Sequence, residues 1–243
     1  MAIDSTVNTP ASAPGLISII VPVFNEGRTV SAVIARLLSI DLPAPREIIV
    51  VNDGSRDDTA AVLDGLAGTP QLTVIHADRN RGKGAAIRLG LSHTRGTIIA
   101  IQDADLELDP AQLADLVAPI LRGDTAVVYG SRFMTRRPGV PRLTRLANWV
   151  LTAITNALYG SSLTEMETCY KILRSDVARG LDLAADRFDI EPEITARLLL
   201  AGHHIVERPV TFTPRSRAAG KTIGWRDGCA AIGVLVRLRR GGR

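Results

Sequence analysis

A short acidic stretch, IQDADLELDP at residues 101–110, follows a run of apolar residues that is typical of a buried strand. Within it, Asp103 and Asp105 are separated by one residue, and Glu107 follows at the same spacing. Proteins usually hold Mg²⁺ with one or two carboxylates, and substrate phosphates supply further ligands. The stretch therefore predicts a divalent-cation site completed by a phosphorylated ligand, with a solvated acidic turn as the alternative. Asp109 precedes a proline and is better explained as a helix N-cap.

Polar or glycine-rich segments also follow three other apolar runs. They are FNEG at 24–27, NDGSRDDT at 52–59 and DRNRGKGAA at 78–86. The chain has neither GxGxxG after its first apolar run nor GxxxxGK[ST], so the patterns of dinucleotide folds and P-loops are missing. Asp57 or Asp58 is expected to cap a helix.

Apolar runs and helical periodicity alternate regularly through the first half of the chain. We expect strands at 16–23, 47–51, 72–77, 97–102 and 125–130, with helices between them at 29–39, 58–67, 84–93 and 110–121. Continuous β-branched runs are typical of strands buried on both faces of a parallel sheet. The pattern predicts an α/β fold with a single doubly wound, mostly parallel sheet flanked by helices. Ligands of such sheets bind at the carboxyl ends of the strands, where all four polar segments lie.

The second half of the chain is less regular and reads as a C-terminal elaboration of the same domain. We expect helices at 141–160 and 190–201, a strand at 203–212 and a basic terminal helix at 229–240. The domain organisation predicted is a flexible tail at 1–15, one domain at 16–228, and a basic amphipathic helix at 229–243.

Composition limits the classes of function. Of the 243 residues, 46% are hydrophobic, which is enough for a substantial core. The net charge is +4, and nearly all of the positive charge is arginine, which suits phosphate binding. Aromatic residues make up only 4% and are not interleaved with basic ones, which argues against nucleic-acid binding. Cys169 and Cys229 are too few for a disulfide framework, so a reducing cytosol is expected.

No stretch reaches the roughly 18 apolar residues of a transmembrane helix, and the N-terminus lacks the pattern of a signal peptide. The apolar AAIGVLV beside RLRR in the terminal helix favours a helix lying on an anionic membrane surface. A solvated basic face is the alternative. We therefore expect peripheral attachment at the cytoplasmic face of a membrane. Arginines that could support it form two clusters: Arg136, Arg137, Arg142 and Arg145, and Arg237, Arg239, Arg240 and Arg243.

Five segments in order, SIIVPVFNE, VNDGSRDDT, NRGKGAA, IQDADLELDP and YGSRF, resemble the inverting glycosyltransferases of family 2, which have a GT-A fold. Three more, TEMETCYKILRSDV, FDIEPEITARLLLAG and RSRAAGKTIGWRDG, narrow the resemblance to the dolichyl-phosphate mannose and glucose synthase group. The resemblance spans residues 16–230, nearly the whole chain.

The resemblance implies a role for each matching residue. Asp105 and Glu107 would bind Mg²⁺ or Mn²⁺, and Asp103 would lie near the ribose. The remaining nucleoside-binding positions would be Pro22, Phe24, Glu26 and Asp53. Arg132 would contact the phosphates, and Arg215 and Lys221 would lie on a loop that closes over the diphosphate and the acceptor phosphate.

Three further residues have open assignments. Glu167 and Cys169 match the segment that flanks the sugar pocket, without an assigned chemical step. Lys83 either approaches the nucleotide or is solvated. Glu191, like Glu193, either faces the substrate or only favours a helix N-terminus.

The expected activity is an inverting, metal-dependent transfer of a hexose from a nucleotide sugar to dolichyl or undecaprenyl phosphate. A lipid phosphate is already ionised at neutral pH, so no general base is required, and the four histidines show no catalytic partner. METCYK and FDIEPEIT resemble bacterial members usually assigned UDP-glucose, which ranks that donor above GDP-mannose. The alternatives are transfer to a soluble acceptor and a non-catalytic nucleotide-sugar-binding subunit. The oligomeric state is left open.

Overall fold

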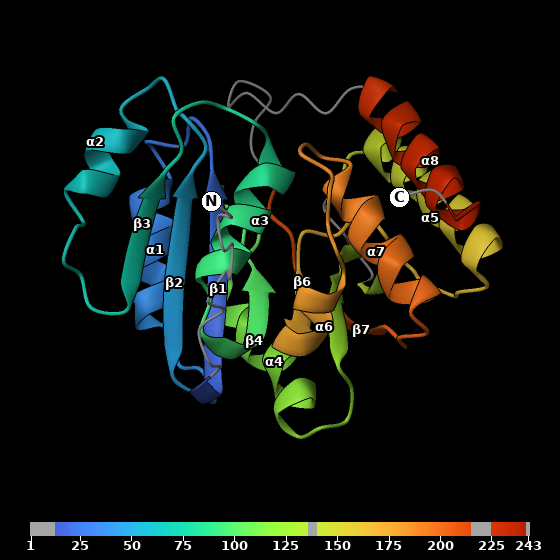
Figure 1. The fold of residues 1–243 in the computed structure, drawn as a ribbon, viewed down its shortest axis with the longest axis horizontal. Helices are drawn as coiled ribbons and strands as arrows, with labels where there is room; N and C mark the ends of the chain where they lie inside the picture. Colours follow the sequence, from blue (N-terminus) through green and yellow to red (C-terminus); the bar gives the residue numbers. More distant parts are fainter. Residues whose placement is uncertain (1–12, 136–139, 215–224, 242–243) are drawn as a thin grey trace, which may run out of the picture.

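The computed structural model describes residues 13–135, 140–214 and 225–241. Across these residues, seven strands form one sheet in the order β3-β2-β1-β4-β6-β5-β7 (Figure 1). Only β6 runs antiparallel to its neighbours among the pairings described. The expected doubly wound, mostly parallel sheet is therefore confirmed. The strands are β1 (Ala13–Val23), β2 (Arg46–Asn52), β3 (Leu72–His76), β4 (Gly96–Ile101), β5 (Val127–Ser131), β6 (Lys171–Arg174) and β7 (Val206–Pro209).

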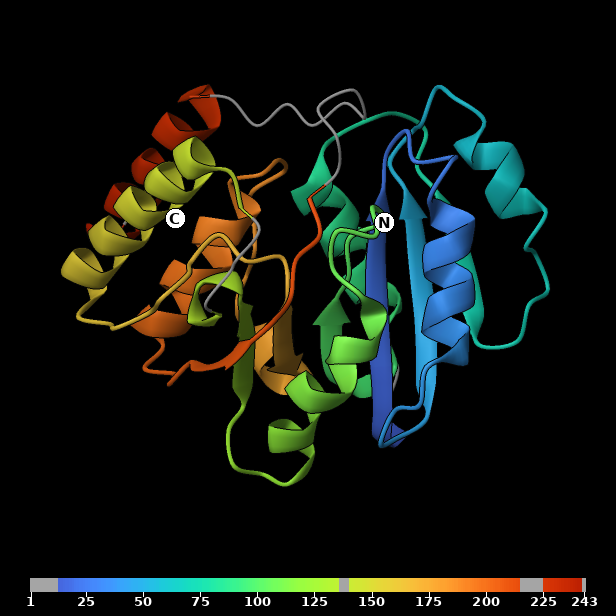
Figure 2. The same cartoon turned by 180° about the vertical axis from the view of Figure 1, so that it is seen from behind.

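The helices cover both faces of the sheet. They are α1 (Val30–Ser39), α2 (Thr59–Asp64), α3 (Lys83–His93), α4 (Leu113–Leu121), α5 (Arg142–Tyr159), α6 (Ser175–Gly180), α7 (Ile190–Leu200) and α8 (Trp225–Arg239), with 3-10 turns η1 (Pro110–Gln112) and η2 (Arg132–Met134). In Figure 1, α3, α6 and α7 lie in front of the sheet, and Figure 2 shows α1 and α4 on the opposite face.

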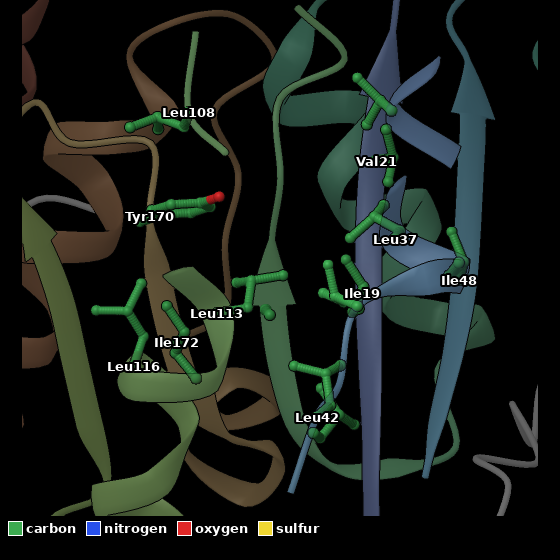
Figure 3. Packing of buried hydrophobic residues seen from close by; sticks show 14 of the residues in the cluster. Ile19, Val21, Leu37, Leu42, Ile48, Leu108, Leu113, Leu116, Tyr170 and Ile172 are labelled. Atoms are coloured by element: carbon green, nitrogen blue, oxygen red, sulfur yellow. The ribbon is translucent and has the colours of Figure 1, made fainter. Parts of the chain in front are cut away.

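Alternating side chains of β1 explain this two-sided packing. Ile19 and Val21 join the core on the α1 and α4 side, whereas Ile20 points into the core formed with α3, α6 and α7. Both faces of the central strand are thus apolar, as a strand buried on both sides requires. Figure 3 shows Ile19 and Val21 beside Leu37 of α1, and Leu113 of α4 in the part of the same cluster that reaches β6.

Four elements differ clearly from the predicted ones. β6 and α6 lie in a segment to which no element was assigned, because β6 has only four residues and begins with a lysine. The strand expected at 203–212 is limited to Val206–Pro209. The helix expected at 58–67 ends at Asp64, where the chain continues as a turn.

Helix α8 packs against α5 and α7, beyond the edge of the sheet (Figure 1). Its buried residues are Ala231, Val234, Leu235 and Leu238. The Tyr159 hydroxyl of α5 also donates a 2.7 Å hydrogen bond to the Leu235 carbonyl. The apolar side of the terminal helix was expected to meet a membrane. In the structure it packs in a hydrophobic core instead. Among the described helices, none combines the length and apolar character needed to cross a bilayer.

Candidate active site

The loops that follow β1 and β2 are tied to each other by side chains. The Asn25 amide donates to Ser55 Oγ at 2.9 Å, and the Arg56 amide donates to Asn25 Oδ1 at 2.8 Å. The Glu26 amide donates to Thr59 Oγ1 at 3.0 Å. Asn25 has a φ of 55°, a conformation that asparagine tolerates better than most residues. These bonds fix the shape of the sheet edge at which a nucleoside is expected.

Residues predicted to contact the nucleoside lie along that edge. Pro22 is partly exposed on β1 opposite Val51 of β2, and the side chain of Phe24 is 40% exposed. The buried Asp53 carboxylate accepts hydrogen bonds from the Arg81 amide at 2.9 Å and the Gly82 amide at 2.7 Å. Asp53 thus shapes the loop before α3, and its contact with a nucleoside stays a prediction.

Two polar side chains, Gln102 and Tyr170, contact the backbone of the acidic turn after β4. Gln102 donates to the Asp103 carbonyl at 3.0 Å, and the Tyr170 hydroxyl lies within hydrogen-bond distance of two acceptors, Gln102 Oε1 at 2.7 Å and the Asp109 carbonyl at 2.9 Å. Within the turn, Asp105 Oδ1 accepts from the Glu107 amide at 3.1 Å. Asp109 accepts from the Ala111 amide at 3.0 Å and caps η1, as predicted.

The donor set of this turn fits a sparse cation site. Asp105 and Glu107 supply carboxylate oxygens from one turn, and Glu107 is buried. In the part of the chain that the structure describes, this turn included, no group of three or more His, Cys, Asp or Glu side chains is arranged to bind a metal alone. Mg²⁺ commonly uses one or two carboxylates and leaves its other positions to water and phosphate. The turn therefore suits a cation that arrives with a diphosphate.

The start of helix α3 packs closely against the segment that precedes α7, and two glycines make this close packing possible. A Cβ on Gly82 would lie 2.5 Å from the Asp186 carbonyl, and one on Gly84 would collide with the Ala185 carbonyl. The Arg88 guanidinium also donates to the Ala184 carbonyl at 2.6 Å and to Asp186 Oδ1 at 2.7 Å. This close packing brings Lys83 beside the first turn of α7.

Five ionisable side chains meet where α3, α7, β4 and β6 converge. Lys83 Nζ lies 2.7 Å from Asp103 Oδ1 and 2.9 Å from Glu191 Oε1. Lys171 Nζ lies 2.5 Å from Glu191 Oε2 and donates to the Thr168 carbonyl at 2.5 Å. The Glu167 carboxyl interacts electrostatically with both lysines and with Glu191. We call Lys83, Asp103, Glu167, Lys171 and Glu191 the lysine–carboxylate cluster.

The charges within the lysine–carboxylate cluster have opposite effects on its members. Burial disfavours the ionised form of Glu191, but Lys171 and Lys83 outweigh it and hold the pKa of Glu191 below its usual value. Burial likewise opposes the charge on Lys83, yet Asp103 and Glu191 raise its pKa well above the usual value. For Glu167 burial prevails and raises the pKa to about 7. Lys83 is therefore a buried, charged member of the site rather than a solvated lysine.

Arg132 is held by a second buried ion pair next to the cluster. Glu165 accepts from the Arg132 amide at 2.7 Å and from Arg132 Nε at 2.7 Å, and it also contacts Nη2. Asn148 of α5 donates to the same carboxylate at 3.1 Å. The Arg132 guanidinium lies 5.0 Å from the centre of the Phe212 ring. Its orientation is thus set by groups from three separate segments.

Most of the predicted site residues converge on one edge of the sheet, and the rest fall outside it or outside the described residues. Glu191 belongs to the lysine–carboxylate cluster, whereas Glu193 accepts from the amides of residues 184 and 185 and is structural. Arg215 and Lys221 lie outside the described residues. Lys171 and Glu165 were missed, because in the sequence a charged residue carries no sign of the partner that buries it.

Comparisons with known proteins identify the family of the chain. Residues 18–181 match the family model described as Glycosyl transferase family 2. The chain is 29% identical over 228 residues to an undecaprenyl-phosphate mannosyltransferase of Micrococcus luteus, covering 88% of this chain and 90% of that protein. It is 27% identical over 209 residues to a dodecaprenyl-phosphate galacturonate synthase of Rhizobium johnstonii and 28% identical over 214 residues to glycosyltransferase AglD of Haloferax volcanii. Each match covers 84% of this chain, but only 61% and 34% of those two relatives.

Solved structures share the fold. Glucosyl-3-phosphoglycerate synthase of Mycobacterium tuberculosis in complex with UDP superposes with a TM-score of 0.68 at 21% identity, over 94% of this chain and 81% of that one. The same enzyme with Mn²⁺, UDP and phosphoglyceric acid gives 0.72 at 19% identity, over 94% and 79%. The seven-stranded sheet is thus a GT-A fold. With a family match that spans the loops after β1, β2, β3, β4 and β5, the chain belongs to glycosyl transferase family 2.

Proposed function

We propose that the protein transfers a hexose from a nucleotide sugar to a polyprenyl phosphate with inversion, and that UDP-glucose is favoured over GDP-mannose as the donor. The observation that carries this proposal is the grouping of the acidic turn, Lys83 and Arg132 at the carboxyl edge of the sheet. Relatives named for undecaprenyl-phosphate and polyprenol-phosphate mannose transfer support the acceptor class.

In this proposal the protein's own groups position and stabilise charge. Asp105 and Glu107 would hold Mg²⁺ or Mn²⁺, which neutralises charge on the departing nucleoside diphosphate when bound. Pro22, Phe24, Glu26 and Asp53 would hold the nucleoside, and Arg132 would contact the phosphates. Arg215 and Lys221 would complete the phosphate contacts. A lipid phosphate is an anionic nucleophile, so the site needs no general base, and a single in-line displacement inverts the anomeric centre.

The first half of helix α5 supports a membrane-bound acceptor, because apolar side chains are exposed there. In its first half the buried side chains are polar, and Asn148 and Thr152 bond to each other while Asn148 also contacts Glu165. The apolar side chains face outward instead, with Leu143 78%, Leu146 57% and Trp149 64% exposed. The exposed Arg142 and Arg145 lie on the same helix, and such a combination of apolar and basic residues suits an anionic bilayer surface. We propose that α5, rather than the buried face of α8, docks the protein on the membrane, at the cytoplasmic face.

Replacing Trp149 with glutamate is expected to lower binding to phosphatidylglycerol vesicles at least about tenfold, because the ring no longer enters the interface and the new charge is repelled. Vesicle co-sedimentation at constant ionic strength measures this. Leu200→Glu is the matched control, since Leu200 is also exposed but lies at the end of α7. Equal loss in both variants, or none in W149E, would contradict docking through α5.

The proposed reaction is tested with purified protein, Mn²⁺, a panel of radiolabelled nucleotide sugars, and undecaprenyl or dolichyl phosphate. We expect label to enter the organic phase from one donor. Nucleotide release without lipid labelling would favour a soluble acceptor. Donor binding without release of nucleotide would favour the non-catalytic nucleotide-sugar-binding subunit. Either result would overturn the polyprenyl-phosphate proposal.

A further inference from the structure

The carboxyl group of Glu167 has an oxygen that the described protein does not satisfy. Glu167 Oε1 is buried and has no hydrogen-bond partner among the described residues. A buried polar atom without a partner is uncommon in folded proteins and calls for an explanation. The residue lies between β5 and β6, and its backbone carbonyl lies 3.4 Å from Arg132 Nη2. A group that belongs to a bound ligand would supply the missing partner.

The cations around Glu167 are already matched by other acceptors. Lys83 faces Asp103 and Glu191, and Lys171 is held by Glu191 together with two backbone carbonyls. Arg132 likewise has its own partner, the buried carboxylate of Glu165. Within the described part of the site, these contacts leave the negative charge of an ionised Glu167 in excess. A second carboxylate brought beside it would meet like charge in a buried environment.

The position of Glu167 relative to a donor follows from the order of the strands, and this step rests on the proposed function. The nucleoside is assigned to the ends of β2 and β1, and the diphosphate with its cation to the end of β4. The next strands along the sheet are β6 and β5. Glu167 lies in the connection between those two strands, so the hexose attached to the diphosphate would extend toward it.

We infer that Glu167 is a specificity-determining residue that admits neutral hexoses and excludes uronic acids. A neutral hexose carries hydroxyl groups that donate hydrogen bonds to Glu167 Oε1. A uronic acid carries an ionised carboxylate at C6, which repels Glu167. Whether this chain takes a neutral hexose or a uronic acid is open, because one relative is named for mannose and another for galacturonate.

The test measures donor binding, so that it does not depend on the acceptor. Calorimetry with Mn²⁺ compares UDP-glucose with UDP-glucuronate and GDP-mannose with GDP-mannuronate, pairs that differ only in oxidation at C6. At pH 8 we expect the wild type to prefer the neutral member by about tenfold or more, since like-charge contacts of this kind are strongly unfavourable. Glu167→Gln should bring the two affinities to within about threefold by removing the repulsion.

Glu193→Gln is the matched control, because Glu193 is a buried glutamate on α7 that bonds to backbone amides outside the cluster. It should leave the neutral-to-uronate ratio unchanged. An unchanged ratio in E167Q, or an equal change in E193Q, would overturn the inference. A ratio that responds to E167Q although no lipid becomes labelled would support the inference while the acceptor proposal fails.

A second measurement uses the wild type alone and needs no variant to fold. The groups facing Glu167 are Lys171 of β6, Glu191 of α7, Lys83 of α3 and Arg132 of η2. Glu191 has a lowered pKa and Lys83 and Arg132 have raised ones, so these three keep their charge between pH 6 and 8. Burial sets the pKa of Glu167 at about 7, so its charge decreases across this range as the pH falls. The ratio of the affinity for the neutral donor to that for the uronate donor should therefore decrease from pH 8 to pH 6. A constant ratio would contradict the inference.

Discussion

Asp105→Asn is expected to lower kcat/KM for lipid-linked sugar transfer about a thousandfold, equivalent to roughly 4 kcal/mol of transition-state stabilisation. The asparagine amide oxygen can still accept the hydrogen bond that Asp105 takes from the Glu107 amide, so the turn is expected to persist. The variant removes the negative charge that would hold the cation, and the departing diphosphate then loses its main source of charge neutralisation.

The measurement is the rate of organic-phase labelling over a range of Mn²⁺ and Mg²⁺ concentrations. Asp109→Asn is the control, since Asp109 is half-exposed, caps η1 and pairs with Arg36 at the surface. Asparagine also serves as an N-cap, so D109N should keep its activity within about twofold. Comparable losses in the two variants would show that negative charge near this turn matters in general, and not the position of Asp105.

Glu165→Ala is expected to lower the free energy of unfolding by about 3–5 kcal/mol, the range observed when one partner of a buried ion pair is removed. Glu165 is fully buried and accepts hydrogen bonds from the Arg132 backbone and guanidinium and from Asn148. Without it, the Arg132 charge remains in a poorly solvated site, and the polar face of α5 loses its acceptor.

Urea unfolding gives the change in free energy if the dependence on denaturant stays constant. Asp176→Ala is the comparison, because Asp176 forms a two-bond pair with Arg174 in which both side chains are more than half exposed. Exposed pairs contribute at most about 1 kcal/mol. The double variant R132M/E165A should recover part of the loss, since it leaves no unmatched buried charge. A cost for E165A no larger than that for D176A would refute the structural role of this pair.

The stability prediction could not have been made from the sequence. Glu165 and Lys171 lie in a segment whose local pattern resembles a solvated loop with scattered charges. Their burial depends on Arg132, 33 residues before Glu165, and on Glu191, 20 residues after Lys171. Neither partner is within reach along one helix or one strand. Contacts between segments far apart in the chain bring these charges together, as Glu191 of α7 does for Lys171 of β6.

Helix α5 illustrates the same limit in another form. Its sequence contains a helical pattern, and a helix at nearly the expected bounds is observed. Ordinary amphipathicity would bury Leu143, Leu146 and Trp149, but the structure exposes them and buries Asn148 and Thr152. In this orientation Asn148 donates a hydrogen bond to Glu165, and Leu151, Ile154 and Leu158 pack against the core that contains Leu235 of α8.

The sequence by itself determined the α/β fold, the polar segments at the carboxyl edge of the sheet, and the acidic turn from Asp103 to Glu107. These features depend on short-range patterns, since apolar runs, helical periodicity and the residues that follow a strand are all read within a few positions. The tertiary structure alone decided which charges are buried together, which face of α5 meets solvent, and that α8 closes a core. Those outcomes depend on contacts between segments that are distant in the sequence, because such contacts bury a charged side chain and change its electrostatic surroundings.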